Sequence, residues 1–320
     1  SDAPGPAPGS GVRGLTGIST RRRMELMPYM VQANDSRLRA EGYGRSQRMA
    51  LGADLKYGLS SNLTLDATIN PDFGQVEADP AVLNLGAFEQ FFEERRPFFL
   101  EGTGIFRYDI DCNDGQCTGP FYSRRIGRSP QAGFLVEDQN AVPLNSTILG
   151  AAKVTGRLSN GLSLGVLNAI TGRESVAESL TVEPRTNYFV ARAQQDLRGG
   201  ASGVGVILTA VNRELDGYTQ DYLRREAYTA GVDGRHRFGA NGNYEITGQL
   251  FGSLVRGSEE AIARTQRSAV HFYQRPDDDL RYDSTRTALS GVGSGIGLSK
   301  NGGLTRFYTG VWYKGPGLEI

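Results

Sequence analysis

The chain contains little cysteine, histidine, methionine or tryptophan: two, two, four and one among 320 residues. No run of about 18 apolar residues occurs, which excludes an α-helical membrane span but leaves a β-barrel open, because barrel strands need only alternate residues to be apolar. Lysine plus arginine total 35, as do aspartate plus glutamate, so the formal net charge is zero. That balance provides no basic footprint for nucleic acid, and no nucleic-acid partner is expected.

Motifs of several common chemistries are also missing. His236 and His271 lie far apart without a cysteine or carboxylate at ligand spacing, which argues against a structural zinc site. No nucleophile elbow, Walker loop or dinucleotide fingerprint occurs, so a non-enzymatic role is favoured and catalysis stays open. Cys112 and Cys117 occupy a short polar loop that can bend, and whether they form a disulfide is left open.

Strand-like alternation of apolar and polar residues is abundant. Leu63, Leu65, Ala67 and Ile69 share one face of residues 62–70, and the run from Ala50 to Leu59 alternates in the same way. Together the two runs predict a β-hairpin. Further strands are predicted near residues 148–158, 162–166, 187–196, 204–211, 228–238, 244–254, 289–300 and 304–314.

Connections between these strands alternate in length. Short Gly- or Asn-containing turns are predicted at residues 159–161, 198–201, 240–243 and 301–303, and longer polar segments separate them. Short turns at one end and long loops at the other are typical of outer-membrane barrels. The glycines at 293, 295 and 297 predict close packing on the lumen face of one strand.

The sequence therefore predicts an all-β fold, an antiparallel transmembrane β-barrel that faces lipid on one side and a polar lumen on the other. Residues 1–20 are expected to be a Pro/Gly-rich linker and residues 21–320 the barrel. Only about ten strands are predicted, so this chain can be part of a larger barrel. A soluble antiparallel sandwich or propeller is the alternative, since it alternates in the same way.

Alternation stops between residues 71 and 125, where an irregular luminal insert or plug is predicted. Its acidic residues are potential calcium ligands or a glycoside-cleaving pair, and its arginines are potential ion-pair partners for them. A structural network of mutual ion pairs is favoured over ligand or ion binding, and binding over catalysis. The candidate residues are Asp72, Glu77, Asp79 and Glu101 together with Arg95 and Arg96.

Three stretches of this region also carry a family resemblance. They are Asn70–Pro80, Glu94–Gly102 and Phe121–Arg128. They resemble an uncharacterised family of bacterial outer-membrane barrels, whose members often carry an N-terminal family 9 carbohydrate-binding module. The resemblance implies a bacterial outer-membrane location and contact with outer-membrane lipid. The module itself is missing from this sequence, so a sugar-related role cannot be assigned from it.

Three functions are compatible with these patterns as hypotheses. The first is a barrel that passes or binds a solute, with a saccharide as one candidate ligand and no resident cofactor except calcium as an option. The second is a surface-anchoring scaffold for a carbohydrate-binding module or a partner protein. The third is a glycan hydrolase that uses carboxylates of the insert, with Glu77 and Glu101 as the pair to test.

Overall fold

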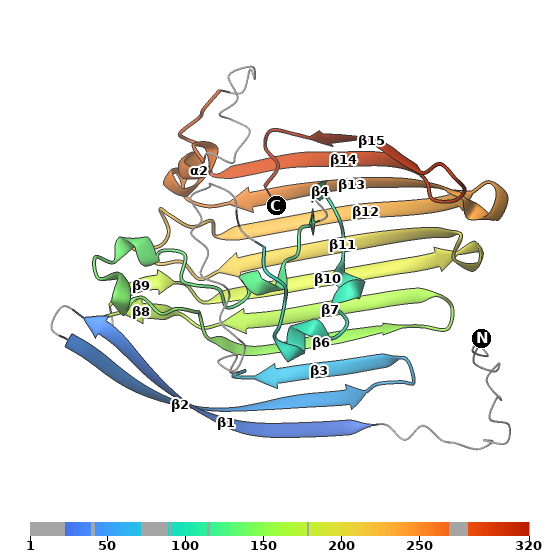
Figure 1. Ribbon diagram of the computed structural model, residues 1–320. Helices are drawn as coiled ribbons and strands as arrows, with labels where there is room; N and C mark the ends of the chain where they lie inside the picture. Colours follow the sequence, from blue (N-terminus) through green and yellow to red (C-terminus); the bar gives the residue numbers. More distant parts are fainter. Residues whose placement is uncertain are drawn as a thin grey trace, which may run out of the picture.

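The computed structural model describes residues 23–39, 42–71, 89, 91–113, 116–177, 179–268 and 281–319. The predicted linker, residues 1–20, lies outside this part of the chain. Within the described residues, eleven strands form one large antiparallel sheet, and helices are few and short (Figure 1). The predicted all-β, antiparallel class is confirmed. No helix of the described residues is long and apolar enough to cross a membrane.

The large sheet follows chain order from one edge to the other. Its strands are β1 (Met24–Arg39), β2 (Gly42–Gly58), β3 (Leu63–Ile69), β6 (Ile148–Arg157), β7 (Leu162–Thr171), β10 (Thr186–Leu197), β11 (Ser202–Arg213), β12 (Glu226–Phe238), β13 (Tyr244–Arg256), β14 (Ala288–Lys300) and β15 (Phe307–Lys314). Two small hairpins pair β4 (Asp111–Asn113) with β5 (Gln116–Thr118) and β8 (Glu174–Val176) with β9 (Leu180–Glu183). The α-helices of the described residues are α1 (Pro97–Leu100) and α2 (Glu259–Gln266), and short 3-10 helices lie between other elements.

Strands β2 and β3 form the hairpin that the alternation of residues 50–70 predicts, with Tyr57 opposite Leu65. Strand β1 was not predicted. Methionines occur on both of its faces, at Met24 and Met27, and Pro28 interrupts the pattern, so the contrast between its faces is weak. Proline is tolerated there because β1 is an edge of the sheet and one side of its backbone needs no partner.

The two ends of the sheet differ in their connections (Figure 1). At one end, short turns join β6 to β7, β10 to β11, and β12 to β13. Gly199 and Asn241 adopt φ of 64° and 58° in two of these turns, a left-handed conformation that glycine and asparagine tolerate best. At the other end, longer segments follow β3, β7, β11 and β13. We call these the turn end and the loop end.

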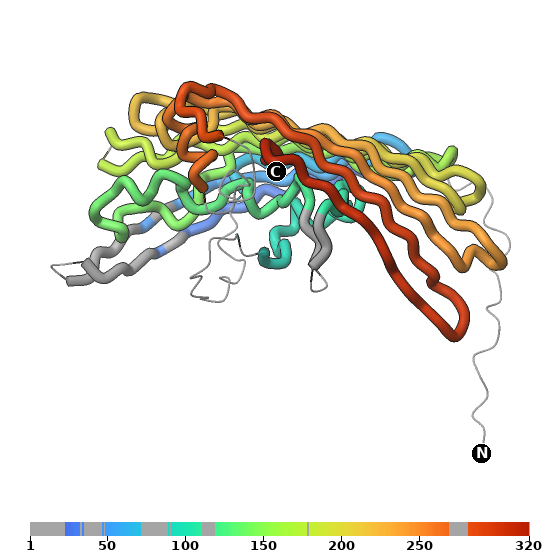
Figure 2. The backbone as a smooth tube through the Cα atoms, turned by 90° about the horizontal axis from the view of Figure 1, so that it is seen from above, coloured from blue at the N-terminus to red at the C-terminus, as the bar shows by residue number. Residues whose placement is uncertain are grey.

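The sheet is curved, and the segment between β3 and β6 lies against its concave face (Figure 2). The predicted insert, residues 71–125, falls within this segment, which continues to Thr147 because β6 begins at Ile148. The segment is not wholly without strands, since β4 and β5 form a small hairpin inside it. We use the name insert for the described residues within 89–147.

Strand register separates two faces of the sheet. Val206, Val232 and Leu250 are cross-strand neighbours in one row, and the adjacent row is Gly205, Asp233 and Gln249. The first row lies on the convex face and the second on the concave face, where the insert packs. Each strand therefore contributes alternate residues to two chemically different surfaces.

The hydrophobic core lies between the insert and the concave face. Phe99, Phe106 and Ile126 of the insert pack against Leu167 of β7 and Val190 of β10. A second cluster joins the insert to β11 and β13, and it consists of Tyr108, Ile110, Ile207 and Phe251 together with Leu318.

Glycines on the concave face allow this close approach. A Cβ on Gly165 would lie 2.8 Å from Ile105 and one on Gly231 would lie 2.8 Å from Tyr108. Side chains also pack directly over the three glycines of β14: Phe251 over Gly293, Trp312 over Gly295 and Tyr308 over Gly297. The predicted packing role of these three glycines is confirmed.

Candidate functional site

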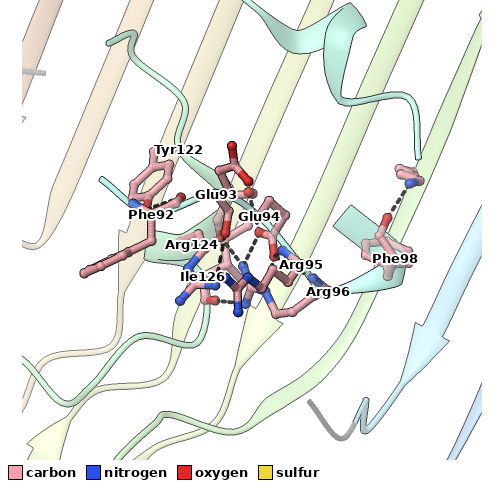
Figure 3. Close-up of polar contacts among 11 residues, drawn as sticks. Phe92, Glu93, Glu94, Arg95, Arg96, Phe98, Tyr122, Arg124 and Ile126 are labelled. Carbon is pink, nitrogen blue, oxygen red and sulfur yellow. Dashed lines mark hydrogen bonds and ion pairs between the residues drawn. The ribbon is translucent and has the colours of Figure 1, made fainter. Parts of the chain in front are cut away.

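Two of the family-like stretches meet in the insert around a buried ion pair (Figure 3). The Arg96 guanidinium donates to both carboxylate oxygens of Glu94, at 2.8 and 2.7 Å. It also donates to the carbonyls of Ile126 at 2.6 Å and Ser123 at 2.8 Å. Both side chains of the ion pair are 9% exposed. Arg96 thereby ties residues 94–102 to residues 121–128.

Further contacts reinforce this junction. The Ser123 hydroxyl donates to Glu94 at 2.5 Å. The Tyr122 hydroxyl accepts from the Phe92 amide at 2.8 Å and donates to the Phe92 carbonyl at 2.9 Å. The Arg96 guanidinium also lies over the Phe99 ring, 4.3 Å from its centroid. The two stretches are therefore complementary halves of one structural unit, the latch, which we define as residues 92–99 and 121–126.

Burial alone would raise the pKa of the Glu94 carboxyl. Hydrogen bonds and the positive charge of Arg96, together with the hydrogen bond from Ser123, outweigh burial and hold that pKa below its ordinary value. Glu94 is thus kept ionised by its partners. A carboxylate with every oxygen committed in this way is suited to holding structure and poorly suited to proton transfer.

The insert is also fastened to the wall of the sheet by charge. The buried Lys153 ammonium of β6 donates to the carbonyls of Phe98 and Glu101, the second at 2.6 Å. The Glu101 carboxylate pairs with Lys56 of β2 at 2.5 Å. Lysines of β2 and β6, the two strands that flank β3, therefore hold the C-terminal end of α1.

The predicted site residues separate in the structure. Arg96 and Glu101 lie in the two polar junctions just described, and Arg95 is exposed next to Glu94. Asp72, Glu77 and Asp79 lie outside the described residues. Elsewhere in the insert, Glu89 pairs with Arg125 at 2.6 Å.

Among the described residues, no three His, Cys, Asp or Glu side chains come together as a metal site. Calcium binding stays a prediction, because three of its proposed ligands are not described. Cys112 and Cys117 lie directly opposite each other in the β4–β5 pairing. Their side chains lie outside the described part of the chain, and the disulfide likewise stays a prediction.

A polar cavity of about 760 Å³ opens between the insert and the turn-end half of the concave face. We call it the concave pocket. Its charged lining residues are Arg107, Asp109, Arg157, Arg192, Asp196, Asp233 and Arg235, and its other polar and aromatic ones include Gln194, Gln195, Gln249, Tyr308 and Trp312. A volume of this size is typical of a small-molecule site.

Ion pairs organise the lining of the concave pocket. The Arg192 guanidinium, 1% exposed, pairs with Asp233 at 2.5 Å. Asp196 pairs with Arg157 at 2.6 Å and with Arg235 at 2.9 Å. Two guanidiniums therefore share one carboxylate, which leaves donors available to a ligand.

Tyr108 of the insert forms the boundary between the concave pocket and the core. Its hydroxyl shares its one hydrogen between the carbonyls of Val232, at 3.0 Å, and Leu250, at 3.2 Å. The Arg192 guanidinium lies 5.2 Å from the centre of its ring. Burial is the main reason that the pKa of the Tyr108 hydroxyl lies above its ordinary value, so it is a donor and stays protonated.

The alternation of the sequence assigns Arg157, Asp233 and Arg235 to the polar side of their strands but does not group them into a site. The sequence signal that could have grouped them is their shared position, on the polar face and in the turn-end half of each strand. Local sequence does not show the order of the strands across the sheet. That order, together with the curvature of the sheet, brings β6, β10 and β12 around one cavity.

The structure defines an all-β protein whose large antiparallel sheet carries a docked insert and a polar pocket on its concave face. The chain belongs to the family described as Domain of unknown function (DUF5916), whose model matches residues 20–287. The match includes the insert and both halves of the latch. No curated protein and no solved structure matches the chain.

Proposed function

We propose that the sheet is the wall of a bacterial outer-membrane β-barrel and that the concave pocket binds or passes a polar solute, with a saccharide as the candidate class. The observation that carries this proposal is the chemistry of the convex face. In the central rows of β10 to β14 its residues are aliphatic, aromatic or small, as in the row Val206, Val232, Leu250 and Ser294, and polar residues such as Gln195, Glu226 and Lys300 lie near the strand ends.

Exposure of these side chains supports a lipid-facing role. Val206, Val232 and Leu250 are 47%, 50% and 55% exposed, although each lies in the middle of a strand. At the far edge of the sheet, Leu26 of β1 is 61% exposed. The second layer of the protein lies on the concave side (Figure 2), so these residues do not serve as its core.

The extent of this surface favours a bilayer over water. Eleven strands at a spacing of about 4.8 Å give a width of roughly 50 Å. An apolar band about 25 Å tall, as in known barrels, would make a surface of about 1,250 Å². The largest apolar patch of a soluble monomer is typically about 300–600 Å².

Aromatic residues occur at two levels of the convex face. Phe189 and Tyr228 share a cross-strand row with Ala210 near the loop end, and Phe238 is paired with Tyr244 near the turn end. Ten positions separate Tyr228 from Phe238 along β12. That is about 33 Å along a strand, or about 25 Å across a bilayer at a tilt near 40°. Two aromatic rows at this separation match the interfacial girdles of a barrel.

Closure of such a wall is constrained by strand direction. The edges β1 and β15 are the first and eleventh strands of an antiparallel order, so they run in the same direction. Pairing β1 directly with β15 would create a parallel seam. An all-antiparallel barrel therefore requires an odd number of further strands between these edges.

The lining of the concave pocket supports a polar, hydroxyl-rich solute. Gln194, Gln249 and Asp109 offer donors and acceptors, and Tyr308 and Trp312 add ring surfaces with centroids 5.9 Å apart. Sugars commonly use this combination, because their hydroxyls take hydrogen bonds and their C–H faces pack on aromatic rings.

The membrane part of the proposal is tested by the solubility and gel mobility of the purified full chain. We expect it to require detergent and to migrate differently before and after boiling in sodium dodecyl sulfate. A chain that remains monomeric and soluble without detergent would contradict the barrel wall.

The solute part is tested in planar bilayers. We expect stepwise conductance that added oligosaccharide reduces. Insertion of the protein into the bilayer without conductance and without saccharide binding would overturn this part. It would favour the scaffold hypothesis, under which the inserted protein should still capture a partner protein.

A further inference from the structure

The acidic and basic groups of the concave pocket differ in what they leave available to a ligand. Among the described residues, four arginines and three aspartates line the pocket, so one positive charge is not balanced. Both oxygens of Asp233 accept hydrogen bonds from Arg192, at 2.5 and 3.0 Å. Both oxygens of Asp109 accept from the Nε of Arg107, at 2.8 Å each. Each of these two carboxylates is therefore matched by a guanidinium of its own.

Asp196 is shared between two arginines. Its Oδ2 accepts from Nη2 of Arg157 at 2.6 Å, and its Oδ1 accepts from Nη2 of Arg235 at 2.9 Å. Within the described part of the chain, each of these guanidiniums makes only that one hydrogen bond out of the five N–H donors it carries. The two side chains are 62% and 37% exposed. The pocket therefore offers charged donors, while every oxygen of its carboxylates already accepts a hydrogen bond.

Glycines of β11 make room for these ion pairs on the floor of the pocket. Gly203 lies between Asp196 and Arg235 in one cross-strand row. A Cβ on Gly203 would lie 3.0 Å from Arg235 Nε and 3.6 Å from Asp196 Oδ1. The guanidiniums of Arg157, from β6, and Arg235, from β12, therefore reach one common carboxylate over a strand that has no side chain at this position.

A solute that carries a carboxylate fits these donors. Guanidiniums bind carboxylates through paired, charged hydrogen bonds. Asp196 shows that Arg157 and Arg235 together accommodate a planar group with one oxygen for each of them. A carboxylate brings one negative charge, which equals the unbalanced charge of the lining. A phosphate group would bring about −1.5 to −2 and would place excess negative charge beside Asp196.

The aromatic part of the pocket lies at some distance from these arginines. Tyr308 and Trp312 belong to β15, and Arg235 belongs to β12. Three strand spacings of about 4.8 Å separate the two strands, or about 14 Å. A carboxylate at Arg235 and a sugar ring packed on Trp312 therefore belong to different units of one chain.

We propose that the solute of the concave pocket is an acidic oligosaccharide, with a carboxylate bound by Arg157 and Arg235 and another of its sugar rings packed on Trp312. This inference rests on the proposed function, because it names the class of solute that the same pocket takes. A preference for neutral sugars would contradict the inference and leave the proposed function standing.

Titration calorimetry of the full chain in a non-ionic detergent tests the class of solute. Trigalacturonate should bind about tenfold more tightly than its methyl ester, which has the same sugar rings without the charges. Raising the sodium chloride concentration should reduce this difference, because salt screens exposed charges. Equal binding of acid and ester would overturn the acidic class and assign the pocket to neutral sugars. Absence of binding by both would overturn the solute part of the proposed function as well.

Substitutions test the two arginines. Arg157→Gln and Arg235→Gln should each weaken binding of trigalacturonate about tenfold, the loss expected for one hydrogen bond between charged groups, and should leave binding of the methyl ester unchanged. The matched control is Arg237→Gln on β12. Arg237 pairs with Glu245 at 2.6 Å and lies outside the lining of the pocket, so this variant should bind the acid as the unmodified chain does. An equal loss in all three variants would show general charge attraction and contradict the site.

Asp196→Asn gives a readout that a purely structural ion pair would not give. Asp196 and the solute carboxylate compete for the same two guanidiniums, so this variant should bind trigalacturonate several-fold more tightly, with little change for the methyl ester. If the arginines only held strands together, the variant would unfold at a lower temperature and its preference for acid over ester would not increase. That result, or tighter binding of inorganic phosphate than of trigalacturonate by the unmodified chain, would overturn the proposal.

Discussion

The convex and concave faces of the sheet are built by the same strands and differ in almost every physical property. Along β12, Val232 points to the convex face and is half exposed, whereas its neighbour Asp233 points to the concave face and pairs with Arg192. On the concave side, buried charges such as Arg96 and Lys153 have dedicated partners. On the convex side, aliphatic side chains have none.

This difference shows that alternation alone does not identify the inside of the protein. In a soluble sandwich, the apolar face is the buried one. Here the aliphatic row of the convex face is exposed, and the concave face, which carries the second layer, combines buried charges with apolar core residues such as Leu167 and Val190. The proposed barrel wall would account for an exposed apolar face opposite a covered mixed one.

The largest expected effect comes from the concave side. Arg96→Ala should destabilise the protein by about 3–5 kcal/mol, because it leaves the Glu94 carboxylate buried without its cation. Urea unfolding measured by the fluorescence of Trp312, the chain's single tryptophan, gives the change. The neighbouring exposed Arg95→Ala should change stability by less than about 0.5 kcal/mol. Equal effects of both variants would show that the latch does not support the fold.

The next prediction compares the two faces at adjacent positions. Leu250→Arg places a charge in the middle of the convex face and should cost about 2–4 kcal/mol in a bilayer. Gln249→Arg places the same side chain in the concave pocket and should cost much less. Unfolding from phospholipid vesicles measures both. Similar costs would remove the distinction between the faces and with it the barrel-wall proposal.

A smaller effect is expected from packing of the insert. A Cβ at Gly231 would lie 2.8 Å from the Tyr108 ring, which two hydrogen bonds hold in place. Gly231→Ala should therefore cost about 1–3 kcal/mol by overpacking. At Gly248, on the convex face, a Cβ would meet nothing within 4 Å, so Gly248→Ala is the matched control. A neutral Gly231→Ala would mean that the insert is not docked as described.

The smallest effect concerns acid. The pKa of Glu94 in the folded protein lies below its ordinary value near 4.5. Its ion pair therefore contributes stability above about pH 4.5, and this contribution is lost as the pH falls through the folded-state pKa. Urea midpoints of the unmodified chain should fall more steeply below pH 4.5 than those of Glu94→Gln. Parallel curves would assign acid sensitivity to other carboxylates.

Most of the sheet was predictable because a strand with one apolar face repeats every second residue. The hairpin of β2 and β3 and the short turns at Gly199 and Asn241 follow from local sequence alone. Strand β1 was not predicted, because Met27 and Tyr29 make its concave face as apolar as its convex face and the alternation is lost. The C-terminal boundary of the insert was predicted too early, at residue 125 and not at residue 147. Residues 126–147 form short irregular elements with no periodic pattern that would mark them as part of the insert.

The candidate site was predictable only in part. The pairing of insert carboxylates with insert arginines was expected as a class, and the Glu94–Arg96 pair is an example of it, although the sequence did not single out these two partners. The Glu101–Lys56 pair was not expected, because Lys56 is 45 positions away in the chain. The concave pocket was not foreseen. Its lining residues come from separate strands and from the insert, and no local spacing links them.

The sequence by itself determined which residues alternate, where the chain turns, and that one long segment would not be a wall strand, since these depend on neighbouring side chains and local backbone preference. Only the tertiary structure decided which face the insert covers and which charges meet. Those outcomes depend on strand order and curvature, which bring together residues more than 100 positions apart, such as Tyr108 and the carbonyl of Val232.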